Sequence, residues 1–395
     1  MSATNKSILS GLDVTEKLWP RDLKNARVGL VVHPASTNRR LEHAVTVCRR
    51  SKKFNITTLF GPQHGILGQT QDNMIEWEGF RDPATGLQVY SLYGKTRKPR
   101  PEMLSNIDVL VVDLQDVGSR YYTFIWTLEL CMEACQEAGK TVIVLDRPNP
   151  INGTAVEGPL LVPEFASFVG LCPLPVRHGM TMGEIGAYLG DTFHPGLDYR
   201  VTPLQGWKRK MWYDQTTLPW VMPSPNMPTL ETALVYPGMC LFEATNISEG
   251  RGTTRPFEIF GAPFIHAETI VAALKEFKLP GVVFRPLSFQ PTFQKHAGLL
   301  CHGAQIHVTD REKFRSFKTG VAILKAIHNT YPRDFAWKQP PYEYEEIMLP
   351  IDILAGTNRL RKDIEAWKDL NEMEAWWKED VRAFDKIRKK FLLYK

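Results

Sequence analysis

Four short runs of apolar residues, rich in β-branched side chains, constrain the fold of this chain more than any other feature. They occupy residues 27–33, 55–60, 107–114 and 140–146. Strands buried on both faces of a parallel sheet have this nearly continuous apolar character. Segments of helical length and spacing, residues 39–52 and 122–139, lie between them. The alternation predicts a Rossmann-like α/β domain built on a parallel sheet.

The length of 395 residues exceeds what one hydrophobic core usually organises, so we expect two domains. After a proline-rich loop at residues 223–228, a helix-like segment (266–277) mixes with a strand-like one (281–285). We therefore predict a Rossmann-like catalytic domain over residues 1–228 and a smaller α+β auxiliary domain over residues 229–395. An amphipathic helix is expected near the C-terminus, within residues 369–395.

Composition and motifs argue against several classes of protein. The net charge of +5 comes partly from short basic runs, which are more often solvated than bound to nucleic acid. No apolar stretch reaches the length of a membrane span and residues 1–17 lack a signal-peptide pattern, so we expect a cytoplasmic protein without membrane contact; a chain trimmed of its signal peptide would look the same. Glycine-rich nucleotide-binding patterns and H-E-x-x-H are absent, so neither cofactor nor metal is expected. The scattered cysteines are expected to be reduced.

The loop at residues 245–256 carries the densest group of polar side chains in the sequence. It combines Asn246, Glu249, Arg251 and Arg255 with four hydroxyl groups and two glycines. Glycine lets a backbone approach a ligand, and arginine can grip a carboxylate with two parallel hydrogen bonds. Because apolar flanks bury the base of the loop, we favour a substrate site over a solvated loop with internal salt bridges.

A second group of candidates follows the apolar run that ends at residue 60. Gln63 and His64 lie in a Gly-Pro-Gln-His-Gly segment, and Glu76 and Glu78 flank Trp77 in the next loop. Ligands of doubly wound folds bind at the carboxyl ends of strands, and a carboxylate beside an aromatic ring is typical of sugar sites. We treat the imidazole, the amide and both carboxylates as catalytic candidates. The alternative is that the glutamates are exposed loop acids and the histidine is a turn residue.

Further candidates follow the later predicted strands. Asp116 lies beyond the run at 107–114 and is another catalytic candidate, although it could instead cap the next helix. Thr181 and Glu184 have the spacing of a capping box, so we assign Glu184 to a helix end. Outside the loop at 245–256, the substrate-binding candidates are Arg120, Tyr122, Asn149, Arg177, His178 and Asn226.

Seven segments occur in an order typical of one protein family. They are Gly-Pro-Gln-His-Gly at 61–65, Ser-Leu-Tyr-Gly at 91–94, Asp-Leu-Gln-Asp-Val-Gly-Ser-Arg-Tyr-Tyr-Thr at 113–123, Leu-Asp-Arg-Pro-Asn-Pro at 145–150, Arg-His-Gly-Met-Thr at 177–181, Pro-Ser-Pro-Asn-Met-Pro at 223–228 and the loop at 245–256. In this order they resemble the NamZ/YbbC family, whose members are exo-β-N-acetylmuramidases of peptidoglycan turnover. The resemblance extends over nearly the whole chain.

The resemblance implies an active-site cleft between a Rossmann-like N-terminal domain and a smaller C-terminal domain. It also implies a partner, a peptidoglycan-derived amino sugar or muropeptide that loses its terminal β-linked N-acetylmuramic acid. Arg251 or Arg255 would hold the lactyl carboxylate of this sugar. Asp116, Asn149 or Asn226 would orient its 2-acetamido group, which can serve as the nucleophile.

One position departs from the family pattern, which usually reads Gly-Pro-Glu-His-Gly. Gln63 stands where the family has its proposed catalytic acid, and an amide cannot donate an acidic proton. Three explanations stay open. Glu76 or Glu78 has taken over the role, or the chain is a hexosaminidase for another sugar, or the chain is a non-catalytic binder of muropeptides or acidic sugars. The sequence does not predict an oligomeric state.

Overall fold

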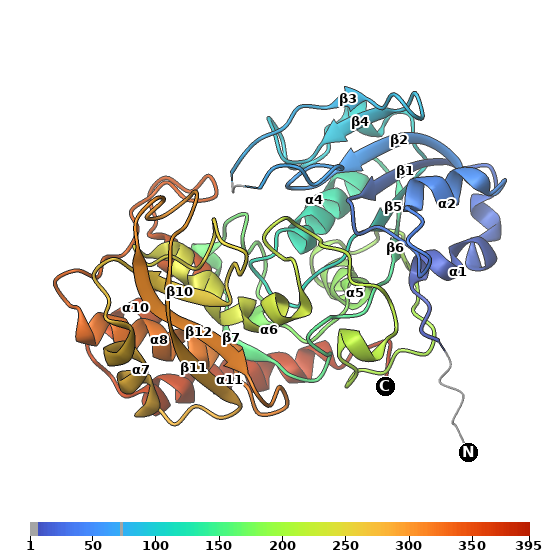
Figure 1. The fold of residues 1–395 in the computed structure, drawn as a ribbon. Coiled ribbons are helices and arrows are strands. Elements are labelled where there is room, and N and C mark those ends of the chain that lie inside the picture. The colour runs from blue at the N-terminus through green and yellow to red at the C-terminus, as the bar shows by residue number, and fades with distance from the viewer. Residues whose placement is uncertain (1–6, 72–73) are drawn as a thin grey trace, which may run out of the picture.

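A seven-stranded sheet dominates the first half of the chain in the computed structural model, which describes residues 7–71 and 74–395 (Figure 1). The strand order is β3, β4, β2, β1, β5, β6, β9, and all neighbouring pairs are parallel except β3 with β4. The bounds are β1 Arg27–Val32, β2 Asn55–Gly61, β3 Phe80–Arg81, β4 Gln88–Ser91, β5 Val109–Asp113, β6 Thr141–Leu145 and β9 Tyr199–Thr202. The four apolar runs form β1, β2, β5 and β6, so the predicted Rossmann-like parallel sheet is confirmed.

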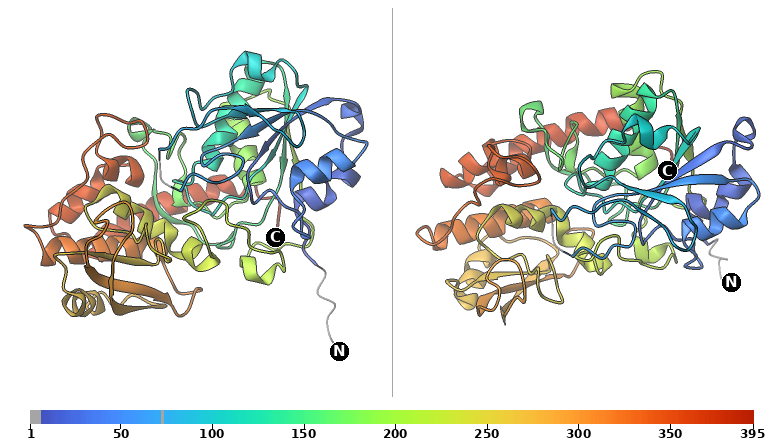
Figure 2. Two further views of the ribbon diagram at one scale, coloured as in Figure 1. Left: turned by 45° about the horizontal axis from the view of Figure 1, so that its top comes forward. Right: turned by 90° about the horizontal axis from the view of Figure 1, so that it is seen from above.

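Helices α1, α2, α4 and α5 pack on the strands of this sheet (Figure 2). The helix expected over 122–139 is α4. The helix expected from residue 39 begins only at Ala44, because the side-chain oxygen of Asn38 accepts hydrogen bonds from the backbone NH groups of Arg40 and Glu42 and holds a turn there. The bounds are α1 Gly11–Leu18, α2 Ala44–Arg50, α3 Pro101–Leu104, α4 Phe124–Glu137 and α5 Met182–Phe193.

The second half of the chain contains a three-stranded antiparallel sheet accompanied by helices. Strand β12 lies between β10 and β11, and α7 packs against β11, β12 and α8. This arrangement confirms the predicted α+β character. The bounds are β10 Ile259–Ala262, α7 Ala267–Lys275, β11 Val282–Phe289, β12 Cys301–Val308, α8 Ser316–Thr330, α9 Pro350–Ala355 and α10 Arg359–Glu365.

A two-stranded ribbon and the last helix connect the two halves. Strand β7 (Glu157–Leu160) pairs antiparallel with β8 (Pro175–Arg177), and α11 (Leu370–Arg388) packs against β7. Helix α11, red in Figure 2, is the amphipathic helix expected from the sequence. Beyond it, the hydroxyl of Tyr394 donates to Asp146 over 2.5 Å, just after β6. The end of the chain is thereby tied to the parallel sheet.

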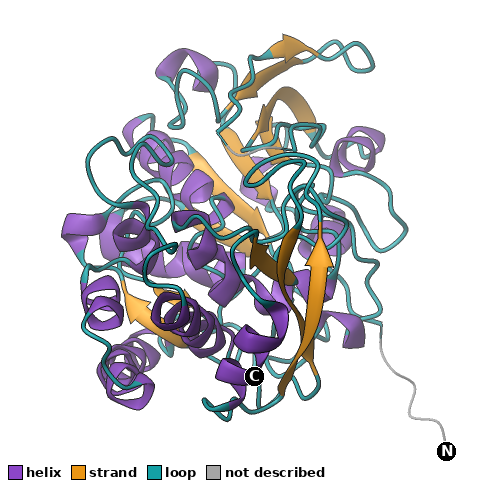
Figure 3. Ribbon diagram, turned by 60° about the vertical axis from the view of Figure 1, so that its left-hand side comes forward, coloured by secondary structure: helices purple, strands orange, loops and turns teal. Residues whose placement is uncertain are grey.

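Helix α6 (Leu230–Met239) begins directly after the predicted domain boundary and leads into the 3₁₀ helix η4 (Cys240–Ala244). It approaches α8 so closely that a Cβ on Gly320 would lie 2.6 Å from the Cα of Gly238. Buried apolar side chains from both halves belong to one continuous cluster, and long loops join many of the elements (Figure 3). The division into two domains stays a prediction.

Two further sequence expectations concern the cysteines and the membrane. The six cysteines all lie within the described residues, where they are buried thiols that form no disulfides. Between residues 7 and 71 and from residue 74 onward, no helix is long and apolar enough to cross a membrane.

Candidate active site

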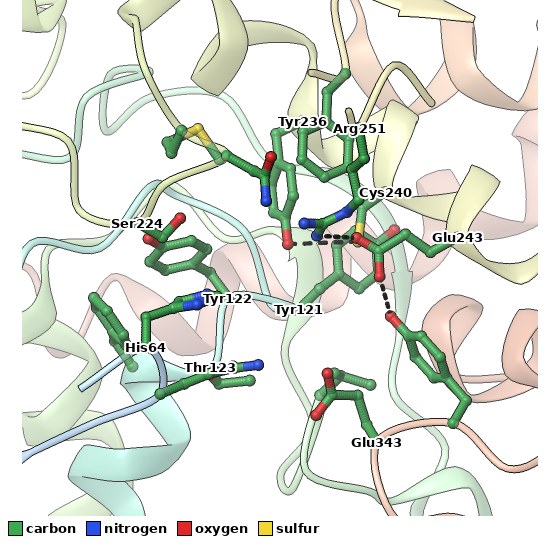
Figure 4. A pocket seen from close by; sticks show the side chains of 17 residues that line it. His64, Tyr121, Tyr122, Thr123, Ser224, Tyr236, Cys240, Glu243, Arg251 and Glu343 are labelled. Carbon is green, nitrogen blue, oxygen red and sulfur yellow. Dashed lines mark hydrogen bonds and ion pairs between the residues drawn. The ribbon is translucent and has the colours of Figure 1, made fainter. Parts of the chain in front are cut away.

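A pocket opens at the carboxyl ends of β2 and β5, where the parallel sheet meets α6 and η4 (Figure 4). It contains about 490 Å³ of space that no protein atom fills, including its mouth. The first half supplies residues 63–64 after β2, residues 121–124 at the start of α4, Val169 and the loop at 224–227. The second half supplies α6, η4 and the loops that follow η4 and precede α9. The lining includes Gln63, His64, Tyr122, Asn226, Tyr236, Glu243, Arg251, Phe257, Tyr342 and Glu343.

Gln63 is buried and belongs to a chain of hydrogen bonds. Its amide oxygen accepts from the hydroxyl of Thr123 over 2.6 Å, and its amide nitrogen donates to the hydroxyl of Tyr93 over 3.0 Å. The Tyr93 hydroxyl in turn donates to a carboxylate oxygen of Glu343 over 2.9 Å. Because an amide nitrogen can only donate, the single proton of Tyr93 is directed at Glu343. The amide of Gln63 therefore orients the hydroxyl of Tyr93 toward Glu343.

Glu343 was not among the residues expected from the sequence. It lines the pocket, and only 4% of its surface is exposed. Burial raises the pKa of its carboxyl to about 7; the hydrogen bond from Tyr93 opposes this rise, and the charge of Glu243 adds to it. Nothing in the segment at 342–346, Tyr-Glu-Tyr-Glu-Glu, marks one of its glutamates for burial. Its partnership with Tyr93 arises only in the folded chain.

Arg251 forms a charged wall of the pocket together with two glutamates. Its Nη2 lies 2.7 Å from Oε1 of Glu243, and its Nε lies 3.4 Å from Oε1 of Glu249. Glu249 also pairs with Lys295 at 2.7 Å, so two cations balance two carboxylates. Burial tends to raise the pKa of Glu243, but the charge of Arg251 and the hydroxyl of Tyr342 outweigh burial and lower the pKa. Glu243 is therefore held ionised.

Two nitrogens of Arg251 form no hydrogen bond with the described residues: Nε, which has only the 3.4 Å contact with Glu249, and Nη1. Within the described part of the chain, Nη1 has no hydrogen-bond partner although it is shielded from solvent. Figure 4 shows the guanidinium group at the edge of the open space. A buried donor without a partner costs about 1–3 kcal/mol, which an oxygen of a ligand would recover. From the loop singled out in the sequence, Arg251 thus reaches the pocket and Glu249 supports it.

Three other expected residues also line the pocket. His64 adopts a left-handed backbone with φ of 67°, and its Nδ1 lies 2.7 Å from the carbonyl oxygen of Thr70. Asn226 donates from its amide to the carbonyl oxygen of Gln71 over 2.6 Å. The buried ring of Tyr122 completes this side. The two hydrogen bonds hold the loop at 70–71 against the rim of the pocket.

Glu76 and Glu78 line a second, more open hollow instead of this pocket. The side chain of Glu76 is 48% exposed, and its carboxylate lies 3.7 Å from Arg97. Trp77, between the two glutamates, is buried and donates from its ring nitrogen to the carbonyl oxygen of Pro62 over 3.1 Å. The structure does not bring either glutamate together with Gln63, so their role as a replacement acid stays a prediction.

Two arginines expected to bind substrate are engaged in structural bonds. Arg120 is buried and donates hydrogen bonds to three backbone carbonyl oxygens, including that of Leu354 in α9. Arg177 pairs with Glu157 at 2.6 Å inside the β7–β8 ribbon. Neither arginine lines the pocket. The bond from Arg120 to Leu354 joins the second half to the first.

Asp116, Asn149 and His178 are buried but do not line the pocket either. Asp116 accepts a hydrogen bond from the NH of Gly118 over 2.6 Å and lies 3.2 Å from Nε2 of His178. Asn149 donates to the carbonyl oxygen of Met180 over 2.9 Å. Among the residues that the structure describes, no cluster of three or more His, Cys, Asp or Glu side chains is placed to hold a metal ion.

The two ends of the loop at 245–256 lie outside the pocket. The side chain of Asn246 binds the backbone of Asp334 and Ala336 at 2.7 and 3.0 Å. Arg255 has a 51% exposed side chain and pairs with Glu258 at 3.0 Å. Of the two arginines in this loop, only Arg251 is placed to meet a ligand in the pocket.

Comparison with known proteins relates both halves of the pocket to one family. The model for the N-terminal part of exo-β-N-acetylmuramidase NamZ matches residues 28–231, and the model for its C-terminal part matches residues 234–394. The chain belongs to the NamZ family. A peptidoglycan β-N-acetylmuramidase NamZ from Bacillus subtilis (strain 168) is 46% identical to it over 393 residues, which cover 100% of this chain and 93% of the relative.

Two crystal structures share the fold of this NamZ-family chain, and both are of DUF1343 family proteins from Bacteroides fragilis NCTC 9343. One is 34% identical with a TM-score of 0.89, covering 98% of this chain and 99% of the other. The second is 30% identical with a TM-score of 0.78, covering 99% of each chain. The family expected from the sequence motifs is thus confirmed, and membership places the chain among the glycoside hydrolases.

The buried carboxyl of Glu343 leads to a prediction about stability. Its pKa is about 7 in the folded chain, against an ordinary value of 4.5 for glutamate, so the folded state binds the proton more tightly than the unfolded state. The free energy of unfolding therefore falls as pH rises from 4.5 to 7, by about 3 kcal/mol if the full difference is expressed. Glu343→Gln removes this loss. We expect the stability of Glu343→Gln relative to the wild type to increase between pH 5 and pH 8.

Chemical denaturation of both proteins at the two pH values measures this difference. Glu346→Gln, at an exposed glutamate of the same segment, is the matched control. Its free energy of unfolding should differ little from that of the wild type at either pH. A difference between Glu343→Gln and the wild type that does not depend on pH would show that the carboxyl of Glu343 has an ordinary pKa.

Proposed function

We propose that this chain hydrolyses the β-glycosidic bond of a terminal N-acetylmuramic acid in peptidoglycan fragments. Membership in the NamZ family supports the reaction class. The observation that carries the choice of sugar is the buried, unpartnered Nη1 of Arg251 at the wall of the pocket. N-acetylmuramic acid differs from N-acetylglucosamine by a lactyl ether that ends in a carboxylate, which is an acceptor of the kind this nitrogen lacks.

The unpartnered Nη1 of Arg251 leaves a place for a carboxylate from a ligand. Nη2 of Arg251 is occupied by Glu243, whereas Nη1 remains available for a second acceptor. Since Lys295 and Arg251 already balance Glu243 and Glu249, a ligand carboxylate does not have to displace a protein carboxylate. A hydrogen bond between charged groups is roughly twice as strong as one between neutral groups. A neutral sugar would offer Nη1 only a hydroxyl or carbonyl oxygen, which is a weaker acceptor than a carboxylate.

The aromatic lining of the pocket supports action on one terminal sugar. The rings of Tyr122, Tyr236 and Phe257 line the pocket and offer apolar faces to a pyranose. An enzyme that holds a single end sugar releases that sugar from the chain end.

The reaction requires a proton donor for the leaving oxygen and a nucleophile for the anomeric carbon. The 2-acetamido group of the substrate can serve as the nucleophile, so the protein needs polar groups that orient this amide. His64 and Asn226 line the pocket and are the groups for this task. Asp116 and Asn149 lie outside the pocket lining. The protein must then supply the acid.

The direct test of the proposed function uses 4-nitrophenyl N-acetyl-β-muramide. We expect saturable release of 4-nitrophenol, faster than from the matching N-acetylglucosaminide. Binding of the muramide without release at any pH would identify a non-catalytic binder of acidic sugars. Faster release from the glucosaminide would identify a hexosaminidase of different specificity.

Arg251→Lys tests the recognition of the lactyl carboxylate. The lysine keeps the positive charge near Glu243 but loses the nitrogen that faces the ligand. We expect kcat/KM for the muramide to fall about 10- to 100-fold, mostly through KM, with little change for the glucosaminide. Arg255→Lys, at the exposed arginine of the same loop, should change kcat/KM for neither substrate. If the ratio of kcat/KM for the muramide to kcat/KM for the glucosaminide is the same in Arg251→Lys as in the wild type, Arg251 does not recognise the lactyl carboxylate.

A further inference from the structure

The pocket contains two buried carboxyl groups, and only one of them is set up to donate a proton. Glu243 accepts from Arg251 at one oxygen, over 2.7 Å, and from the hydroxyl of Tyr342 at the other, over 2.6 Å. It is therefore held as an anion. Glu343 accepts from the neutral hydroxyl of Tyr93 and, within the described residues, forms no ion pair. Glu343 is thus the carboxyl of the pocket that can keep a proton.

We propose that Glu343 is the general acid of this chain, in place of the glutamate that the family pattern has at position 63. The inference rests on the proposed hydrolysis reaction. It is supported by the line of hydrogen bonds from Gln63 through Tyr93 to Glu343, which connects the position that lost its carboxyl to the carboxyl that remains.

The amide at position 63 fits this assignment. With a glutamate there, Tyr93 would lie between two carboxyl groups and could give its one hydroxyl proton to only one of them. Gln63 instead donates to the oxygen of Tyr93, so that the hydroxyl proton points to Glu343. Thr123 fixes the orientation of the amide from its other side. The substitution therefore orients Glu343 through Tyr93, and Gln63 and Tyr93 act as positioning residues.

The groups that face Glu343 come from four parts of the chain. They are Gln63 after β2, Tyr93 after β4, Glu243 in η4 and Arg251 in the loop after η4. Burial raises the pKa of Glu343 most strongly, Glu243 adds to the rise, and Tyr93, Gln63 and Arg251 oppose it. The resulting value of about 7 leaves much of the carboxyl protonated at neutral pH. A proton donor works best with a pKa near the pH at which it acts.

In the first step, the proton of Glu343 moves to the glycosidic oxygen as the bond between this oxygen and the anomeric carbon breaks. The electron pair of that bond leaves with the oxygen, and the acetamido oxygen forms the new bond to the anomeric carbon. In the second step, water attacks the same carbon while the Glu343 carboxylate takes a proton from it. The bond between this carbon and the acetamido oxygen breaks, which opens the five-membered ring formed in the first step. Glu343 is then protonated again, and no other reactant is consumed.

Leaving-group dependence tests this role, because 4-nitrophenolate departs without help from an acid whereas a sugar alkoxide does not. We compare 4-nitrophenyl N-acetyl-β-muramide with the disaccharide of N-acetylmuramic acid β-linked to N-acetylglucosamine. For Glu343→Gln we expect kcat/KM to fall about 10²- to 10⁴-fold on the disaccharide and at most about tenfold on the aryl substrate. Glu346→Gln should leave both unchanged.

The pH profile supplies a second readout. Wild-type kcat/KM on the disaccharide should decline as pH rises through about 7, where Glu343 loses its proton. Tyr93→Phe removes a hydrogen bond that lowers this pKa, so its decline should move to higher pH. A profile that does not move in Tyr93→Phe would contradict the assignment, and this variant keeps the carboxyl and the ring in place.

The outcomes separate this inference from the proposed function. A wild-type protein that cleaves neither substrate overturns the proposed function and the inference with it. A wild-type protein that cleaves both, with Glu343→Gln losing nothing or losing equally on both, overturns only the role of Glu343. A loss confined to the disaccharide in Glu76→Gln or Glu78→Gln, and absent from Glu343→Gln, assigns the acid to the loop at 76–78 instead.

Discussion

The burial of two carboxyl groups with different partners is the constraint on which the chemistry of this pocket depends. Glu243 and Glu343 are both buried, but their partners differ. Arg251 compensates the charge of Glu243, which stays ionised, whereas Tyr93 offers Glu343 only a neutral hydroxyl and the pKa rises to about 7. Environments that separate the pKa values of two neighbouring carboxyl groups give them different roles. Here one anchors the arginine that we expect to bind substrate, and the other can carry a proton.

This arrangement depends on both halves of the chain. The parallel sheet places Gln63 and Tyr93 at its strand ends, while η4 and the following loops contribute Glu243, Arg251 and Glu343. The contacts that hold the two halves together therefore also bury the carboxyl group of Glu343. They include the continuous apolar cluster, the close approach of α6 to α8 and the buried bonds of arginines such as Arg120.

Sequence patterns predicted the fold better than the site. The apolar runs became parallel strands, and Thr181 with Glu184 formed the expected capping box, because these features depend on local periodicity and spacing. Side-chain type alone could not separate Arg251, which reaches the pocket, from Arg120 and Arg177, which bind backbone or a buried carboxylate. Glu343 was missed because its burial is a tertiary property: its hydrogen-bond partner is Tyr93, far away in sequence.

A crystal structure with a non-hydrolysable thioglycoside of N-acetylmuramic acid β-linked to N-acetylglucosamine would test the proposed site most directly. We predict that the carboxyl of Glu343 lies within hydrogen-bond reach, about 2.6–3.2 Å or slightly more for sulfur, of the bridging atom, with the lactyl carboxylate on Nη1 of Arg251. A bridging atom that instead lies against Glu76 or Glu78, with Glu343 out of reach, would contradict it.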